Sequence, residues 1–183
     1  HMIKFISIGL TVIMFFFKTS LYANYEKVFF DFKINSITGE IIDFKDYKGK
    51  AVLLVNTASY CGFTKQYTKL QELWDKYKSK GLIVLAIPSN SFRQEKNSDD
   101  EVKNFCEVNF NINFPISTIS DVKGDNAHEI FKWAEDNYGK QAIPKWNFHK
   151  ILINKSGKIE DTYTSFISPT SKKIINKIEK LLN

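Results

Sequence analysis

The chain has 183 residues, of which 43% are hydrophobic, and a formal net charge of +6. This length and composition suit one globular domain with a sizeable core. The lysines are scattered, and no basic run is interleaved with stacking aromatic residues, which argues against a nucleic-acid-binding protein.

The N-terminal residues indicate a targeting segment rather than part of the fold. His1 stands before the first methionine and is taken as a cloning residue. Lys4 precedes an apolar run over 5–17, which is shorter than the roughly 20 residues that span a bilayer. We expect residues 1–23 to be this cloning residue plus a signal peptide, and the mature chain to be periplasmic or extracellular. An uncleaved membrane tether is the alternative.

Residues 24–183 are predicted to form a single domain in which strands and helices alternate. Expected strands or extended pieces cover 27–34, 40–44, 51–56, 82–87, 114–119, 150–154 and 158–162, and expected helices cover 64–78, 98–109, 126–138 and 169–182. The first two strands flank a turn cluster and predict an N-terminal β-hairpin. The apolar runs 51–56 and 82–87, joined by one helix, predict a parallel βαβ unit. The strands 150–154 and 158–162 flank a Lys-Ser-Gly turn and predict a terminal antiparallel β-hairpin. The fold class is therefore α/β, with a central mixed β-sheet flanked by helices.

Cys61 is the first candidate for chemistry. It falls between the strand 51–56 and the helix 64–78, where α/β sheets bind ligands and where a helix N-terminus favours a thiolate. Position alone leaves open disulfide exchange, a structural bridge, an inert buried cysteine, and peroxide reduction. Disulfide exchange through Cys-x-x-Cys would need a cysteine where this chain has Thr64.

Three ordered segments narrow these choices. Residues 56–64 read Asn-Thr-Ala-Ser-Tyr-Cys-Gly-Phe-Thr, residues 87–95 read Ile-Pro-Ser-Asn-Ser-Phe-Arg-Gln-Glu, and residues 146–150 read Trp-Asn-Phe-His-Lys. They resemble the Asn-x-Ala-Ser-x-Cys-Gly-x-Thr, Pro-x-Asn-Gln-Phe with a following Gln-Glu, and Trp-Asn-Phe-x-Lys motifs of the glutathione peroxidase family. The resemblance covers about residues 26–181, in a cysteine-containing form, and implies a thioredoxin-like fold.

The resemblance implies reduction of hydrogen peroxide and organic hydroperoxides by a tetrad of Cys, Gln, Trp and Asn. Cys61, Trp146 and Asn147 occupy three of these positions, and the Trp and Asn side chains can donate hydrogen bonds toward sulfur. Without the motif, a packed Trp and a turn Asn would be the ordinary interpretations. The Gln position holds Ser91, a shorter donor, and the nearby Gln94 fits the Gln-Glu segment better.

Cys106 resembles the resolving cysteine of the two-cysteine, thioredoxin-dependent branch of the family. This role implies a Cys61–Cys106 disulfide that a thioredoxin-like protein reopens. The alternative is a packing cysteine, because Cys106 shares the apolar face of its predicted helix with Val102 and Phe105. If the two sulfurs begin on separate elements, that helix has to unwind in each cycle.

The reductant and the assembly follow from the same resemblance. Tetrameric, glutathione-using members of the family carry a long insertion in the segment between 132 and 146, which is short here, so the resemblance favours a monomer. Arg93 is the only arginine, so the chain has no arginine cluster for the carboxylates of glutathione, which favours a protein dithiol as the reductant. His128 and His149 lack metal-ligand spacing, so we expect no metal and no cofactor. Two other functions stay open: a thiol-disulfide oxidoreductase on the same fold, and a non-catalytic secreted domain held by a permanent Cys61–Cys106 bridge.

Overall fold

The computed structural model describes residues 25–183, so the expected signal peptide lies outside the described residues. A four-stranded mixed sheet with the order β4-β3-β5-β6 forms the centre. Its strands are β3 (Ala51–Thr57), β4 (Leu82–Pro88), β5 (Lys150–Ile153) and β6 (Ile159–Tyr163). β3 runs parallel to β4 and antiparallel to β5, as expected for a βαβ unit joined to a terminal hairpin. Within residues 25–183, no helix has the length and apolar character needed to cross a membrane.

The helix α1 (Gln66–Tyr77) connects the two parallel strands. Its buried side chains recur at three- and four-residue spacing and therefore lie on one face: Tyr67, Leu70, Leu73 and Tyr77. A short 3₁₀ turn follows the helix, and the chain then leaves through Gly81, whose φ of +102° is a left-handed conformation that glycine adopts at little cost. Every residue of β3 and β4 is buried, which explains their continuous apolar sequences.

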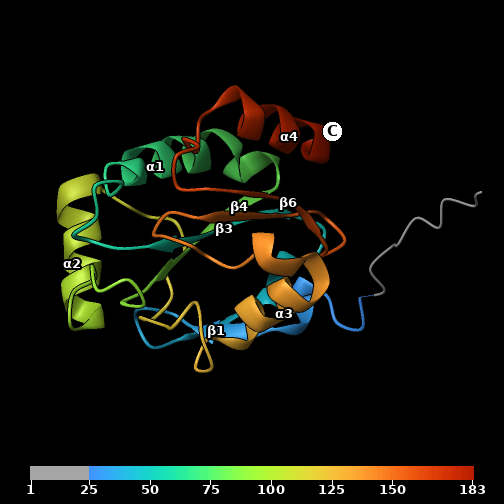
Figure 1. The fold of residues 1–183 in the computed structure, drawn as a ribbon. Helices are drawn as coiled ribbons and strands as arrows, with labels where there is room; N and C mark the ends of the chain where they lie inside the picture. The colour runs from blue at the N-terminus through green and yellow to red at the C-terminus, as the bar shows by residue number, and fades with distance from the viewer. Residues whose placement is uncertain (1–24) are drawn as a thin grey trace, which may run out of the picture.

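Helices cover both faces of the sheet (Figure 1). α1 and α4 (Lys172–Leu182) lie on one face, and α3 (Glu129–Tyr138) and the N-terminal hairpin lie on the other. Successive side chains of β3 point to opposite faces of the sheet. Leu53 and Val55 pack in the core under α1 and α4, while Val52 and Leu54 pack in the core under α3. Each of these buried side chains contributes about 1.5–3 kcal/mol through burial.

The N-terminal hairpin is confirmed, but its strands are shorter than expected. β1 (Lys33–Asn35) pairs antiparallel with β2 (Ile41–Asp43) in a separate two-stranded sheet. The start of the expected strand 27–34 is instead a 3₁₀ turn at Phe29–Asp31. Phe29 and Phe30 are both buried in this turn, and Phe29 stacks on Phe44 at 4.4 Å, centroid to centroid.

The helix α2 (Asp99–Phe110) begins as its sequence predicts. The Ser98 hydroxyl accepts a hydrogen bond from the Glu101 backbone N–H (3.3 Å), and the Glu101 carboxylate accepts one from the Asn97 N–H (3.1 Å). Asn111, in the left-handed conformation, ends the helix. The extended piece 114–119 makes only isolated bridges, which tie β4 to the N-terminal hairpin.

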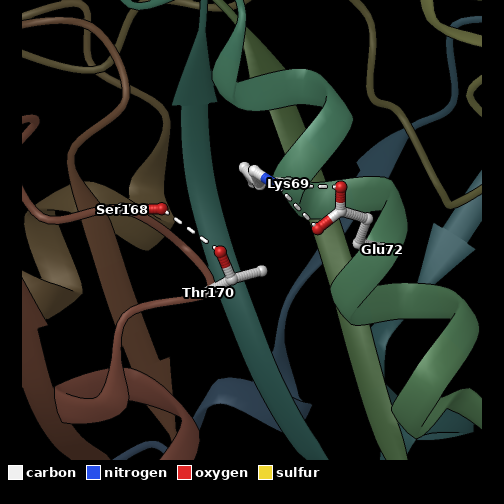
Figure 2. Close-up of polar contacts among 4 residues, drawn as sticks. All are labelled: Lys69, Glu72, Ser168 and Thr170. Atoms are coloured by element: carbon white, nitrogen blue, oxygen red, sulfur yellow. Dashed lines mark hydrogen bonds and ion pairs between the residues drawn. The ribbon is translucent and has the colours of Figure 1, made fainter.

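Surface polar contacts contribute little to the placement of α1 and α4 (Figure 2). Lys69 contacts both carboxylate oxygens of Glu72 at 2.9 and 3.0 Å on the exposed side of α1. Ser168 and Thr170 hydroxyls lie 3.4 Å apart in the segment that leads to α4. The Tyr77 hydroxyl of α1 also donates to the Glu179 carboxylate of α4. Because exposed ion pairs contribute at most about 1 kcal/mol, apolar packing is the main interaction that fixes these helices against the sheet.

Candidate active site

Three loops meet at one edge of the central sheet. The loop 58–65 leaves the carboxyl end of β3, and the loop 89–98 leaves the carboxyl end of the parallel neighbour β4. The segment 142–149 enters β5, which is antiparallel to β3, and so lies at the same edge. The three motif segments recognised in the sequence therefore converge, and this is the edge at which α/β sheets bind ligands.

Cys61 lies in a tightly closed turn in the first of these loops. It is 8% exposed, and the backbone N–H of Phe63 points at its Sγ at 3.4 Å. Thr64 closes the turn: its hydroxyl accepts from the Cys61 N–H (3.0 Å) and donates to the Ala58 carbonyl (2.8 Å). The threonine that replaces the second cysteine of a Cys-x-x-Cys motif thus has a structural function, which the sequence did not reveal.

The loop after β4 holds the Cys61 turn from the other side. The Tyr60 N–H donates to the Gln94 carbonyl (2.9 Å), and the Ser59 N–H donates to Glu95 Oε1 (3.0 Å). The same Glu95 oxygen accepts from the Lys96 N–H (2.8 Å). Burial raises the pKa of the Glu95 carboxyl, although these hydrogen bonds oppose the shift. Two consecutive residues before Cys61 are therefore fixed by two consecutive residues of the second loop.

Asn56, the first residue of the cysteine motif, ties the third segment to β3. Its side-chain amide donates to the Trp146 carbonyl (3.0 Å), and its backbone carbonyl accepts from the Phe148 N–H (2.6 Å). Phe148 has a φ of +63°, an uncommon conformation for a residue with a side chain. This turn puts Asn147 between two anchored residues.

Trp146 and Asn147 differ in exposure. The Trp146 side chain is 41% exposed and packs at 5.3 Å, centroid to centroid, against Phe92. Asn147 is fully buried, and its Nδ2 donates to Gln94 Oε1 at 2.8 Å, while its Oδ1 has no partner among the described residues. The Asn147 Oδ1 is therefore left for a donor outside the described side chains.

Ser91, at the family's Gln position, has its hydroxyl engaged away from Asn147. It accepts from the Ser89 hydroxyl (3.0 Å) and from the Val122 N–H (3.1 Å), and it donates to Asp121 Oδ1 (3.3 Å). Sequence reasoning placed Gln94 outside the tetrad, yet Gln94 is the residue that contacts Asn147.

Cys106 lies in the interior of α2. It is fully buried in the same apolar core as Cys61, and both cysteines are free. Burial raises the pKa of the Cys106 thiol to about 11, although the Tyr67 hydroxyl acts in the opposite direction. At neutral pH the folded helix therefore keeps this thiol protonated.

Lys150, the last residue of the third motif, is fully buried at the start of β5. Its Nζ donates to the Phe148 carbonyl at 2.7 Å, so it supports the turn that carries Asn147. Burial lowers the pKa of this amine from 10.5 to about 7. Its neighbour His149 is also buried, and burial lowers the pKa of the imidazole to about 4. In residues 25–183, no group of three or more metal-ligating side chains lies together.

The lowered pKa of Lys150 makes the free energy of unfolding depend on pH, in a direction that follows from the shift. Between pH 7 and 10.5 the unfolded chain holds the Lys150 proton and the folded chain releases it, so the free energy of unfolding rises with pH. The contribution is at most about 1.4 kcal/mol per pH unit. We expect Lys150→Met to remove this rise, measured by urea unfolding from pH 7 to 8.5. The exposed control Lys65→Met should keep the wild-type slope; an unchanged slope in Lys150→Met would contradict the assignment.

Comparison with known proteins agrees with this geometry. The glutathione peroxidase family model matches residues 29–135. The glutathione peroxidase-like peroxiredoxin GPX5 of Chlamydomonas reinhardtii is 40% identical over 158 residues, which cover 85% of this chain and 96% of that protein. The hydroperoxy fatty acid reductase gpx1 of a Synechocystis strain is 40% identical over 162 residues, covering 84% and 95%.

A solved structure supports the same assignment. The crystal structure of Trgpx in its apo form is 35% identical, with a TM-score of 0.68, over 86% of this chain and 96% of that one. The expected thioredoxin-like fold, with a mixed sheet flanked by helices and an N-terminal hairpin, is thereby confirmed. The chain therefore belongs to the glutathione peroxidase family of peroxidases.

Proposed function

We propose that this chain reduces hydrogen peroxide and organic hydroperoxides with Cys61 as the attacking residue. The observation that carries the proposal is the closed Cys61 turn, with an N–H aimed at the sulfur, beside the anchored Trp146-Asn147 pair. A donor at sulfur interacts more strongly with a thiolate than with a thiol. The partly exposed Trp146 gives the small oxidant a side chain to contact at the mouth of the site.

In the proposed first step the Cys61 thiolate attacks one oxygen of the hydroperoxide. The sulfur–oxygen bond forms while the oxygen–oxygen bond breaks, so sulfur is oxidised to sulfenic acid and the peroxide is reduced. The departing hydroxide or alkoxide takes up a proton and leaves as water or alcohol. The indole N–H of Trp146 and the amide of Asn147 are suited to orient the peroxide and to stabilise the departing oxyanion.

In the second step the Cys106 thiol condenses with the Cys61 sulfenic acid, releasing water and forming a disulfide. Cys106 is buried in a helix and protonated at neutral pH, so we propose that α2 opens locally to present it. A dithiol protein of the thioredoxin type then reduces the disulfide by exchange and restores both thiols. The short connection between α3 and β5 and the single arginine support this donor, and a monomer, over glutathione.

Organic hydroperoxides have a place to lie beside Trp146. A hollow of about 420 Å³ is lined by Trp146, Ile143, His149 and Phe166 among others. Phe166, 81% exposed, forms its rim and packs edge-on at 5.2 Å against Phe63, two residues after Cys61. An apolar rim continuous with the cysteine loop suits the carbon chain of a hydroperoxide.

Phe166→Ala tests this use of the hollow. We expect the KM for cumene hydroperoxide to rise roughly fivefold, because about 1 kcal/mol of apolar contact is lost, while kcat/KM for hydrogen peroxide stays within about twofold. Steady-state kinetics with both oxidants give the comparison. Ile41→Ala, another exposed apolar residue but on the N-terminal hairpin, is the matched control. Equal changes for the two oxidants would argue against the hollow as a substrate site.

The expected export of the chain remains part of the proposal. It rests on the apolar segment 5–17, which is outside the described residues. An exported enzyme would draw its electrons from a dithiol protein of the same compartment.

A coupled assay tests the proposed function. The protein, without residues 1–23, is given hydrogen peroxide or cumene hydroperoxide together with thioredoxin and its NADPH-dependent reductase, or with glutathione and glutathione reductase. We expect NADPH oxidation with thioredoxin to exceed that with glutathione by at least about tenfold. Absence of turnover with every reductant would reject the proposal, and faster turnover with glutathione would reject the dithiol donor.

A further inference from the structure

We propose that Gln94 is a positioning residue of the peroxide step. It takes the role of the Gln that the family motif has at position 91, where this chain has Ser91. The inference rests on the proposed function of Cys61. Gln94 makes one hydrogen bond to each of the two segments that have to be held together: its carbonyl to the Tyr60 N–H, next to Cys61, and its side chain to Asn147. It therefore ties the nucleophile's loop to the amide that the proposed mechanism places against the oxidant.

The local backbone explains how Gln94 reaches the site. β4 ends at Pro88, and the chain turns at 90–93, where the Arg93 N–H donates to the Asn90 carbonyl (2.8 Å). Arg93 has a φ of +59°, a left-handed conformation that is uncommon for a residue with a side chain. The side-chain carbonyl of Asn90 accepts from the Glu95 N–H (3.3 Å) and closes the turn. After this reversal, Gln94 and Glu95 both face the Cys61 loop.

The hydrogen bond to Gln94 determines the orientation of the Asn147 amide. Asn147 is fully buried, and the bond to Gln94 Oε1 fixes which end of its side chain is the donor end. Nδ2 has two hydrogens, so one remains for the sulfur or the peroxide after Gln94 takes the other. Without Gln94, no side-chain acceptor among the described residues holds Nδ2, and the second hydrogen is no longer directed.

Ser91 does not compete for this function. Its hydroxyl is used by Ser89, Asp121 and the Val122 N–H, and it fixes the segment at 121–122 instead. The Gln-Glu segment thus supplies an amide to the site, while the family's Gln position holds a serine.

The experiment compares Gln94→Met, which keeps the size and removes the acceptor, with Ser91→Ala. The readout is the second-order rate constant for oxidation of Cys61 by hydrogen peroxide in a single turnover, without any reductant. We expect Gln94→Met to lower it about tenfold and Ser91→Ala to leave it within about twofold. A loss in Ser91→Ala with a wild-type rate in Gln94→Met would overturn the inference.

A double-mutant cycle with Asn147→Ala separates positioning from general loosening. If Gln94 acts through Asn147, the rate of Gln94→Met/Asn147→Ala equals that of Asn147→Ala alone. Losses that multiply would show that Gln94 acts independently of Asn147 and would reject the inference. Failure of the proposed function would give a different result: the Cys61 of the wild-type protein would then not be oxidised by peroxide.

Discussion

Replacing Cys61 by serine is expected to abolish peroxide consumption, with a loss of at least about 10³-fold in kcat/KM. A hydroxyl is not ionised at neutral pH, and no general base contacts residue 61: the polar partners of Cys61 in the described structure are the Phe63 N–H and the Thr64 side chain and N–H. Oxidation of NADPH in the thioredoxin-coupled assay measures the loss.

The fold should survive this change. Serine keeps the backbone bonds to Thr64 that close the turn, so the thermal midpoint of Cys61→Ser should stay close to that of the wild type. A folded Cys61→Ser protein that still consumes peroxide would show that another residue is the nucleophile.

Cys106→Ser is expected to separate the two halves of the cycle. The first equivalent of peroxide is still reduced at the wild-type rate, because Cys61 and the residues around it are unchanged. Turnover with the thioredoxin donor then falls at least about tenfold, since no second thiol condenses with the sulfenic acid. A rapid-mixing trace shows a burst of one peroxide per chain followed by a slow phase.

Val102→Ala controls for damage to the helix. Val102 is fully buried in α2, one turn before Cys106, and its truncation weakens the packing of α2 by about 2 kcal/mol without removing a thiol. Its turnover should equal or exceed the wild-type rate if opening of α2 limits recycling. A Cys106→Ser enzyme that retains full thioredoxin-dependent turnover would remove the resolving role.

The sequence predicted the central fold because its signals are local. β3 begins with five consecutive apolar residues, β4 is apolar throughout, and α1 shows helical spacing of large side chains, so the type of each element follows from its hydrophobic period. The N-terminal strand was predicted to be too long because the structure of its first residues depends on contacts that are not local. Phe29 lies in a 3₁₀ turn and stacks on Phe44 at 4.4 Å, a contact between residues far apart in sequence that no local pattern indicates.

The sequence predicted those residues of the candidate site that the family motifs assign to it. Cys61, Trp146 and Asn147 lie on loops at one sheet edge, as expected from residues that follow or precede neighbouring strands. The choice between Ser91 and Gln94 depends on the left-handed Arg93, and an arginine carries no sequence signal for that conformation. The role of Thr64 in closing the Cys61 turn was not predicted either, because a threonine in a loop can have many roles.

The most direct test counts free thiols and measures the intact mass before and after one equivalent of hydrogen peroxide. We predict two free thiols in the reduced protein, loss of both together, and a mass about 2 Da lower, as expected for a Cys61–Cys106 disulfide. Proteolytic mapping should locate the bond between these two residues. An absence of free thiols at the start, under non-reducing purification, would indicate a permanent bridge. Loss of a single thiol with a gain of about 16 Da as the stable product would contradict the resolving role of Cys106.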